Sequence, residues 1–163
     1  MIYIEAPSNE AWYDKKSVFL AGGITDCPQW QAELVKMLAN SDLVLLNPRR
    51  ENFPIDDPSA AKTQIQWEYE HLRDADAISF WFCKDTLCPI VLYELGAWSM
   101  TEKPIFVGVE EGYARRQDVE IQTALVRPDV QIESSLEMLA DSIRNWYRAD
   151  NQHPLDAGMS WVS

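Results

Sequence analysis

The residue that points most directly to chemistry is Glu94. It lies near the start of an otherwise apolar segment, Ile90–Trp98, which has the length and composition of a buried helix. A carboxylate in the first turn of a helix is stabilised by the helix dipole and stays ionised, as a nucleophile must. A glutamate at a helix start also occurs for stability alone. The residues themselves leave both interpretations open.

Two further groups of residues follow apolar runs and have the chemistry of binding sites. Gly22, Gly23 and Ile24 come after the run Ser17–Ala21, where glycine lets backbone N–H groups approach a sugar or phosphate or simply makes a turn. The full dinucleotide fingerprint and the Walker pattern are missing, which argues against a Rossmann-type cofactor and ATP hydrolysis.

Asn47, Arg49 and Arg50 directly follow the run Leu43–Leu46. Guanidinium groups bind phosphates and carboxylates in pairs of hydrogen bonds and stack on flat rings. The alternative is that Arg49 and Arg50 are surface residues whose positive charges balance the surrounding acidic residues. Trp81 has the ring to stack on a nucleobase, although aromatic residues in a central strand are more often core.

The alternation of short apolar runs with helical patterns predicts the fold. Strands are expected at 17–21, 43–46, 76–83, 105–109 and 130–132. A first helix is expected to begin after a cap near Asp26 or Cys27, and four more helices are expected at 60–75, 90–100, 118–125 and 135–147. Residues 1–6 offer an additional edge strand. Apolar strands between helices indicate a three-layer α/β sandwich with a five-stranded parallel sheet in one domain, 1–149. The tail 150–163 has no clear element, and its Trp161 is a candidate to pack on the body or a neighbouring subunit.

Composition limits the classes of function. The chain has 26 acidic residues and 14 Lys and Arg, which gives a formal charge of -12. This negative charge disfavours binding to nucleic acid. No apolar run approaches the ~20 residues of a membrane helix, and the first residues lack the basic and apolar parts of an export signal. The chain has three cysteines, Cys27, Cys83 and Cys88, and because this number is odd we expect reduced thiols in the cytoplasm. A zinc site is disfavoured because no histidine lies near them in the sequence.

Several segments in a fixed order resemble the nucleoside 2-deoxyribosyltransferases, in particular their deoxyribosyltransferase-like branch. The resemblance covers about residues 17–143. The segments are Phe19–Ile24, Leu46–Arg50, Asp74-Ala-Asp76, Phe80–Phe82, Cys88–Ile90, Tyr93-Glu-Leu-Gly96 and Tyr113–Val119. The resemblance implies a flavodoxin-like fold and cleavage of the N-glycosidic bond of a (deoxy)nucleoside or its 5′-monophosphate, with no metal or organic cofactor. It also implies a homo-oligomer.

The same resemblance implies roles for three carboxylates. Glu94 matches the glutamate that attacks C1′ and forms a covalent glycosyl-enzyme, which another base or water then resolves. Asp76 corresponds to the aspartate that protonates the leaving base, and Asp85 to the one that binds sugar hydroxyls. Arg49, Arg50, Arg115 and Arg116 would favour a substrate with a 5′-phosphate. A catalytically weak module that binds or senses a nucleotide on the same fold is the alternative.

Overall fold

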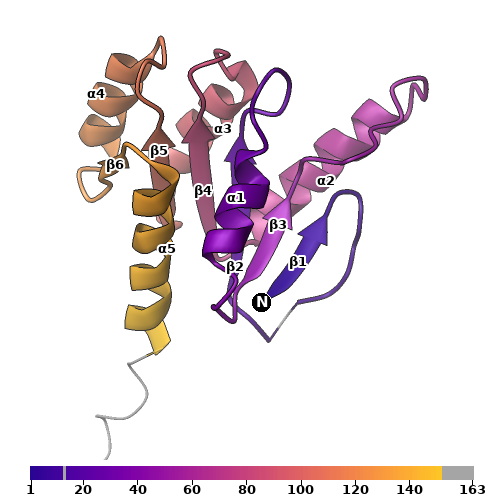
Figure 1. Ribbon diagram of the computed structural model, residues 1–163, viewed down its shortest axis with the longest axis horizontal. Helices are drawn as coiled ribbons and strands as arrows, with labels where there is room; N and C mark the ends of the chain where they lie inside the picture. Colours follow the sequence, from indigo (N-terminus) through magenta and orange to yellow (C-terminus); the bar gives the residue numbers. More distant parts are fainter. Residues whose placement is uncertain (13, 152–163) are drawn as a thin grey trace, which may run out of the picture.

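The computed structural model describes residues 1–12 and 14–151, in which strands and helices alternate along the chain (Figure 1). The strands are β1 (Ile2–Glu5), β2 (Ser17–Gly22), β3 (Val44–Asn47), β4 (Ala77–Phe82), β5 (Ile105–Val109) and β6 (Ile132–Glu133). The helices are α1 (Trp30–Met37), α2 (Ala60–Asp74), α3 (Pro89–Ser99), α4 (Arg116–Val126) and α5 (Leu136–Asn151). The prediction about Trp161 falls outside the described residues.

All six strands pair in parallel in one sheet, in the order β1-β3-β2-β4-β5-β6. Without β1, the order of the other five is that of the flavodoxin-like folds. The predicted α/β fold with a parallel sheet is therefore confirmed, but the sheet has six strands rather than five. The sixth is the edge strand β1, whose Ile2 lies opposite Val44 of β3.

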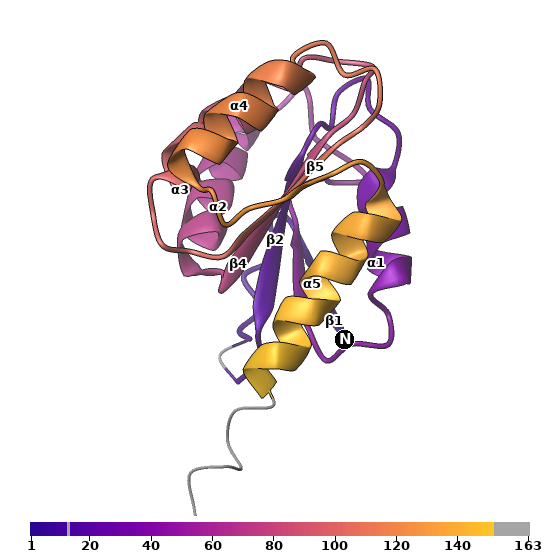
Figure 2. The ribbon, with the colours of Figure 1, turned by 90° about the vertical axis from the view of Figure 1, so that its left-hand side faces the viewer.

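The helices form two layers, one on each face of the sheet. Figure 2 shows α1 and α5 on one side, and α2, α3 and α4 on the other. Right-handed crossovers explain this division, because the chain moves from β2 to β3 in one direction and from β3 to β4, β5 and β6 in the opposite direction. Every residue of β2, β3 and β4 is buried between these layers, which is why these strands are mainly apolar, with Ser17, Asn47 and Ser79 as their polar residues.

Several predicted boundaries differ from the structure, the largest difference at a helix end being that α5 runs to Asn151 rather than 147. Helix α1 begins at Trp30 rather than near Asp26 or Cys27, because Asp26 has a φ of 57°, which no right-handed helix contains. The last strand, β6, comprises only Ile132 and Glu133 rather than residues 130–132.

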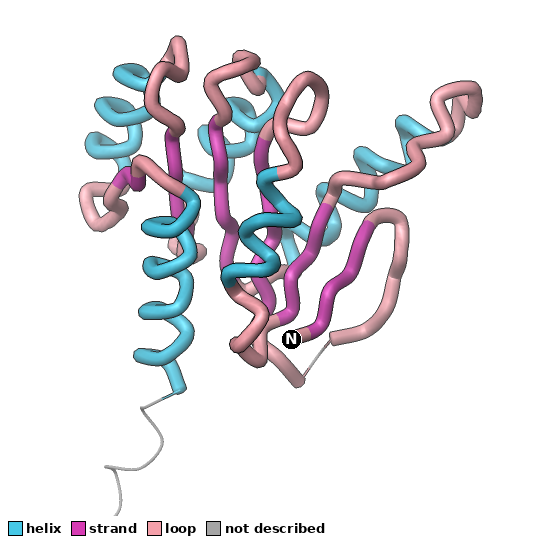
Figure 3. Tube along the Cα trace, in the orientation of Figure 1, coloured by secondary structure: helices cyan, strands magenta, loops and turns pink. Residues whose placement is uncertain are grey.

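The sheet has one topological switch point, between β2 and β4. The chain leaves β2 toward α1 on one face and leaves β4 toward α3 on the other, which opens a crevice at the carboxyl ends of these strands. The loops that follow β2, β4 and β5 lie together at this edge (Figure 3). Among the described helices, none has both the length and the apolar character that crossing a membrane requires.

Candidate active site

A cavity of about 340 Å³ lies at the switch point. Its walls come from β2 and the turn after it, from the end of β3, and from helices α2 and α3. The lining residues are Phe19, Ala21, Gly22, Gly23, Ile24, Thr25, Pro48, Glu68, Thr86, Cys88, Pro89, Ile90, Val91 and Glu94. The lining is mainly apolar with two carboxyl groups, which is the character of a small-molecule site.

Glu94 lies in this cavity, but its electrostatic setting differs from the prediction. It is the sixth residue of α3, beyond the first turn, so the partial charge at the helix N-terminus does not act on it strongly. Burial, together with the negative charge of Glu68, raises the pKa of Glu94 to about 8. The expectation that the helix dipole keeps Glu94 ionised is therefore wrong, and at neutral pH the carboxyl group of the free protein holds a proton.

Glu68, on α2, is the second carboxyl group of the cavity and was missed by the sequence analysis. Burial raises the pKa of Glu68, and the hydrogen bond that Gln64 donates to its Oε1 at 2.8 Å works in the opposite direction. The Gln64 amide also donates to the carbonyl of Pro48 at 2.7 Å, which fixes α2 against the end of β3. The spacing of four between Gln64 and Glu68 on one helix face was the available signal.

The predicted residues Gly22, Gly23 and Ile24 do line the cavity. Their glycines are explained by close packing. A Cβ at Gly22 would overlap the ring of Trp30 and lie 2.8 Å from the carbonyl oxygen of Trp81. The carbonyl of Gly23 accepts a hydrogen bond from Trp30 Nε1 at 2.9 Å, which holds the turn against α1.

Asn47, Arg49 and Arg50 do not line the cavity, because their side chains are engaged elsewhere. Asn47 donates to the hydroxyl of Tyr3 at 2.7 Å and accepts from the backbone N–H of Arg49 at 3.0 Å. The Arg50 guanidinium lies 5.4 Å from the ring centroid of Phe53.

The Arg49 guanidinium binds the loop before α1. It donates to the carbonyls of Pro28 and Cys27 at 2.7 and 3.0 Å and to Gln31 Oε1 at 3.3 Å. Burial lowers the pKa of Arg49 somewhat from its usual value. Through these contacts Arg49 links the end of β3 to the loop before α1.

The arginines at the start of α4 are also engaged. Arg116 donates to the carbonyl of Val109 at 2.9 Å, to Glu120 at 2.7 Å and to Ser134 Oγ at 3.1 Å, and thereby ties α4 to β5. Arg115 pairs with Asp118 at 3.1 Å. Within residues 1–12 and 14–151, the cavity lining contains no arginine or lysine.

Asp76 lies at the amino ends of the strands, whereas the cavity lies at their carboxyl ends. Its Oδ2 accepts hydrogen bonds from the backbone N–H and the hydroxyl of Ser17, at 2.7 and 2.9 Å, where β2 and β4 begin. This geometry contradicts the role of proton donor that the resemblance implied, and makes Asp76 a link between two strands. Asp85 does lie at the carboxyl edge, but it is exposed, and its neighbour Thr86 lines the cavity instead.

Trp81 is a core residue. It is 5% exposed, and a Cβ at Gly108 would meet Trp81 at 2.6 Å and Leu139 of α5 at 3.3 Å. Trp81 therefore packs between the sheet and α5, on the face opposite the cavity, and is not placed to stack on a base there.

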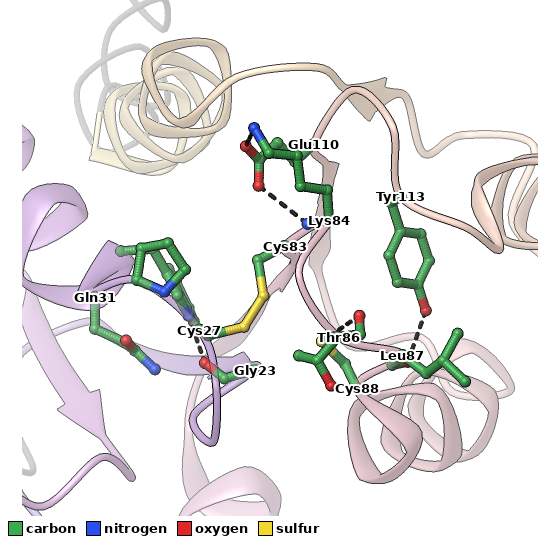
Figure 4. The surroundings of a disulfide bond; sticks show 12 residues. Gly23, Cys27, Gln31, Cys83, Lys84, Thr86, Leu87, Cys88, Glu110 and Tyr113 are labelled. Atoms are coloured by element: carbon green, nitrogen blue, oxygen red, sulfur yellow. Dashed lines mark hydrogen bonds and ion pairs between the residues drawn. A yellow bond between two sulfur atoms is a disulfide. The ribbon is translucent and has the colours of Figure 1, made fainter.

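The cysteines differ most from expectation. Cys27 and Cys83 form a disulfide with a Cα–Cα distance of 6.3 Å, and Cys88 is a buried free thiol beside it (Figure 4). The prediction of three reduced thiols is wrong for the first two. The sequence separation of 56 concealed the pairing, because only the fold brings the turn after β2 next to the end of β4.

A protein-family model described as "nucleoside 2-deoxyribosyltransferase like" matches residues 15–113, more than half of the chain. The chain belongs to this family. The match includes both cavity glutamates and the turn after β2, and it supports a role in nucleoside-related glycosyl transfer. Like the parallel α/β sheet, it agrees with the family recognised from the sequence. None of the curated proteins matches the chain significantly.

Proposed function

We propose that this member of the nucleoside 2-deoxyribosyltransferase-like family cleaves the N-glycosidic bond of a nucleoside through a covalent glycosyl-Glu94 intermediate. The observation that carries the proposal is the pair of carboxyl groups, Glu94 and Glu68, in one cavity at the switch point of the sheet. A bond broken through an oxocarbenium-like transition state needs one carboxylate near C1′ and one proton donor near the leaving group.

The two glutamates share one proton near neutral pH. Glu94, with a pKa of about 8, holds it in the free protein, while Glu68 carries the negative charge that contributes to this pKa. As positive charge develops on the sugar, it favours the ionised form of Glu94. We propose that the proton then passes to Glu68, that Glu94 attacks C1′, and that Glu68 protonates the leaving base. Glu68 thus takes the role that the resemblance had given to Asp76.

The lining also bears on the substrate. Two carboxyl groups, and no lysine or arginine among the described lining residues, make the cavity a poor site for an anion. The apolar side chains Phe19, Ile90 and Val91 suit a flat base. This favours a neutral (deoxy)nucleoside over its 5′-monophosphate, contrary to what the arginines in the sequence had indicated. Transfer to a second base or to water completes the reaction.

The proposal is tested by incubating the full chain with 2′-deoxynucleosides of each base and measuring free base by chromatography. Glu94→Gln is expected to lower base release by about 1,000-fold or more. Wild-type protein quenched in acid should show the mass of a 2-deoxyribosyl adduct, and Glu94→Gln should not. Glu120→Gln is the matched control, since Glu120 pairs with Arg116 on α4 outside the cavity. Unchanged base release in Glu94→Gln would overturn the mechanism.

The alternative is a binding or sensing module, which the proton held by Glu94 at neutral pH favours. It predicts that a nucleoside binds in calorimetry with the same affinity to wild-type protein and to Glu94→Gln, and that neither releases base over hours. Single-turnover release by the wild-type protein excludes this alternative.

We also propose a homo-oligomer. Helix α3 is apolar on nearly all sides, whereas the monomer covers only the side facing the sheet. Large apolar side chains are exposed on the outer side of α2, α3 and α4. They are Ile65, Tyr69, Ile90, Tyr93, Met100, Ile121, Leu125 and Val126. A second copy of the chain is the occupant that the family resemblance indicates for this surface.

A further inference from the structure

The three cysteines form a compact sulfur cluster beside the cavity. Their Sγ atoms all lie within 4.8 Å of one another, although they come from the loop before α1, the end of β4 and the start of α3. Each of the three residues is at least nine-tenths buried. Two of the sulfurs are joined and the third, Cys88, is a free thiol next to the bond (Figure 4).

The cluster reaches the cavity wall through one of its members. Cys88 lines the cavity and is the residue immediately before α3, with a φ of 47°. Gly23 lies among the three sulfurs, because a Cβ there would overlap Cys27 Sγ and come within 2.8 Å of Cys88 Sγ and 3.2 Å of Cys83 Sγ. The bonding state of these sulfurs therefore bears directly on the turn after β2 and on the helix that carries Glu94.

We propose that Cys27, Cys83 and Cys88 form a thiol–disulfide exchange site, in which Cys88 takes over one partner of the Cys27–Cys83 bond. In the exchange, the Cys88 thiolate attacks Sγ of Cys27, a Cys27–Cys88 bond forms and the Cys27–Cys83 bond breaks. The electron pair leaves on Cys83 Sγ, which takes up the proton that Cys88 gave up. Attack on Cys83 is the equivalent step with Cys27 as leaving group, and neither step changes the oxidation state of the protein.

The surroundings of Cys88 set the rate of this step. The Cys88 thiol donates to the carbonyl of Thr86 at 3.6 Å, and burial is the largest effect and raises the pKa of Cys88, against a smaller lowering effect of the backbone at Cys83 and Gly23. The attacking species is the thiolate, so exchange is slow at neutral pH and accelerates by about tenfold for each pH unit below that pKa.

A metal ion is the competing occupant of the cluster. Three thiolates would suit a soft metal, but structural zinc takes four protein ligands, and among the described residues no fourth cysteine, histidine or carboxylate joins the group. Metal binding also needs all three cysteines reduced, whereas two of them are joined. These observations favour exchange.

Exchange would move one end of the covalent link, from β4 or from the turn after β2, to the residue that precedes α3. In the Cys27–Cys83 state, the turn after β2 is tied to the neighbouring strand, and α3 is free of the bond. In a state that includes Cys88, the start of α3 is tied either to the turn after β2 or to β4, and the link between those two segments is broken. The two states differ in what constrains the cavity wall, whether or not the cavity is catalytic.

Cleavage by trypsin after lysine and arginine places the three cysteines on separate peptides, residues 17–36, 74–84 and 85–115. The third peptide extends to residue 115 because the Lys103-Pro104 bond resists cleavage. The full-length native protein is oxidised with a small disulfide, oxidised glutathione, which takes up the two electrons of each dithiol. The protein is then held at pH 7 or pH 9, and exchange is stopped with acid. Free thiols are alkylated in denaturant at the same acid pH, so that no exchange occurs during this step, and the protein is digested. Mass spectrometry measures the pairs of linked peptides.

We expect wild-type protein to contain peptide 85–115 linked to one of the other two, reached about tenfold or more faster at pH 9 than at pH 7. Cys83→Ser should form the Cys27–Cys88 bond, while Cys88→Ser should keep only Cys27–Cys83. Complete alkylation of Cys88 in the wild type at both pH values would overturn the proposal, as would the lack of a Cys27–Cys88 bond in Cys83→Ser. A stoichiometric metal ion on three reduced thiols, found by elemental analysis of the purified protein, would also overturn it.

Discussion

At the scale of single residues, the proposed chemistry depends on two carboxyl groups in one cavity, Glu68 and Glu94. The pair belongs to two helices of one layer, and burial in the same cavity raises both pKa values. Neither carboxyl group can be assigned its state without the other, because the negative charge on Glu68 contributes to the raised pKa of Glu94. The chemistry proposed here requires the singly protonated pair.

The first prediction is a bell-shaped dependence of kcat/KM on pH. Below the raised pKa of Glu68 both carboxyl groups are protonated and no nucleophile exists, whereas above about pH 8 the pair has lost the proton that the leaving base needs. Glu68→Gln removes both the proton donor and the negative charge, so base release should be low. It should rise with pH through a lowered pKa of Glu94, and the alkaline limb should disappear. The measurement is base release from pH 4 to 10. An alkaline limb at the same pH in Glu68→Gln would contradict the coupling.

The second prediction concerns stability and needs no substrate. The pKa of Glu94 is about 8 in the folded protein and near 4.5 in the unfolded chain. Its contribution to stability is therefore fully present below about pH 4.5 and is lost as the pH rises through 8. Wild-type protein should lose Tm relative to Glu94→Gln between pH 5 and pH 9 in thermal unfolding. Parallel Tm curves for the two proteins would show that Glu94 ionises normally.

At the scale of secondary-structure elements, two contacts hold the strands that form the switch point. At one end, Asp76 accepts two hydrogen bonds from Ser17, where β2 and β4 begin. At the other, the turn at Gly23 is enclosed by the sulfur cluster and by Trp30. The first contact lies away from the cavity and the second forms its wall, so substitutions in the two places should affect different properties.

The third prediction is that Asp76→Ala destabilises the fold without removing the chemistry. The backbone N–H and hydroxyl of Ser17 would lose their acceptor, at a cost of about 1–3 kcal/mol in the free energy of unfolding. Chemical denaturation measures this cost, and kcat at a temperature where the variant is folded should stay within about threefold of the wild type. A large loss of kcat in a folded variant would restore Asp76 as a catalytic group.

The fourth prediction compares two glycines of the family motifs. A Cβ at Gly23 meets three sulfur atoms, whereas a Cβ at Gly96 in α3 meets nothing within 4 Å. Gly23→Ala should therefore lower the free energy of unfolding by about 1–3 kcal/mol, and Gly96→Ala should raise it by about 0.4–1 kcal/mol, because alanine suits a helix interior. Denaturant titration of both variants checks the signs. Destabilisation by Gly96→Ala would mean that this helix position is covered in solution.

At the scale of the whole molecule, the sequence was informative where burial alone decides the structure. The apolar runs of β2, β3 and β4 predict a parallel sheet because strands covered on both faces have few polar positions. The family motifs also placed Glu94 at the carboxyl edge. These inferences need only local pattern and the topology rules of α/β folds.

The rest depends on contacts between distant segments. Glu68 joins Glu94 because α2 and α3 line the same cavity, and Cys27 meets Cys83 across a sequence separation of 56. Arg49 follows a strand as a ligand-binding arginine would, yet backbone carbonyls of the loop before α1 take up its donors. The number of hydrogen-bond partners a side chain finds within its own fold cannot be read from its position in the sequence.

The fifth prediction concerns assembly through the apolar outer side of α3. The Tyr93 side chain is 77% exposed in the monomer, beside the cavity glutamate, and such an apolar face is typical of a surface covered by another subunit. Tyr93→Glu places a charge there and should shift the wild-type dimer or larger oligomer toward monomer in sedimentation velocity. Met138→Glu is the matched control, because Met138 is an exposed residue of α5 on the opposite face of the sheet, and it should leave the oligomer unchanged. A wild-type protein that is monomeric at micromolar concentration would instead mean that α3 keeps its apolar outer side exposed to water.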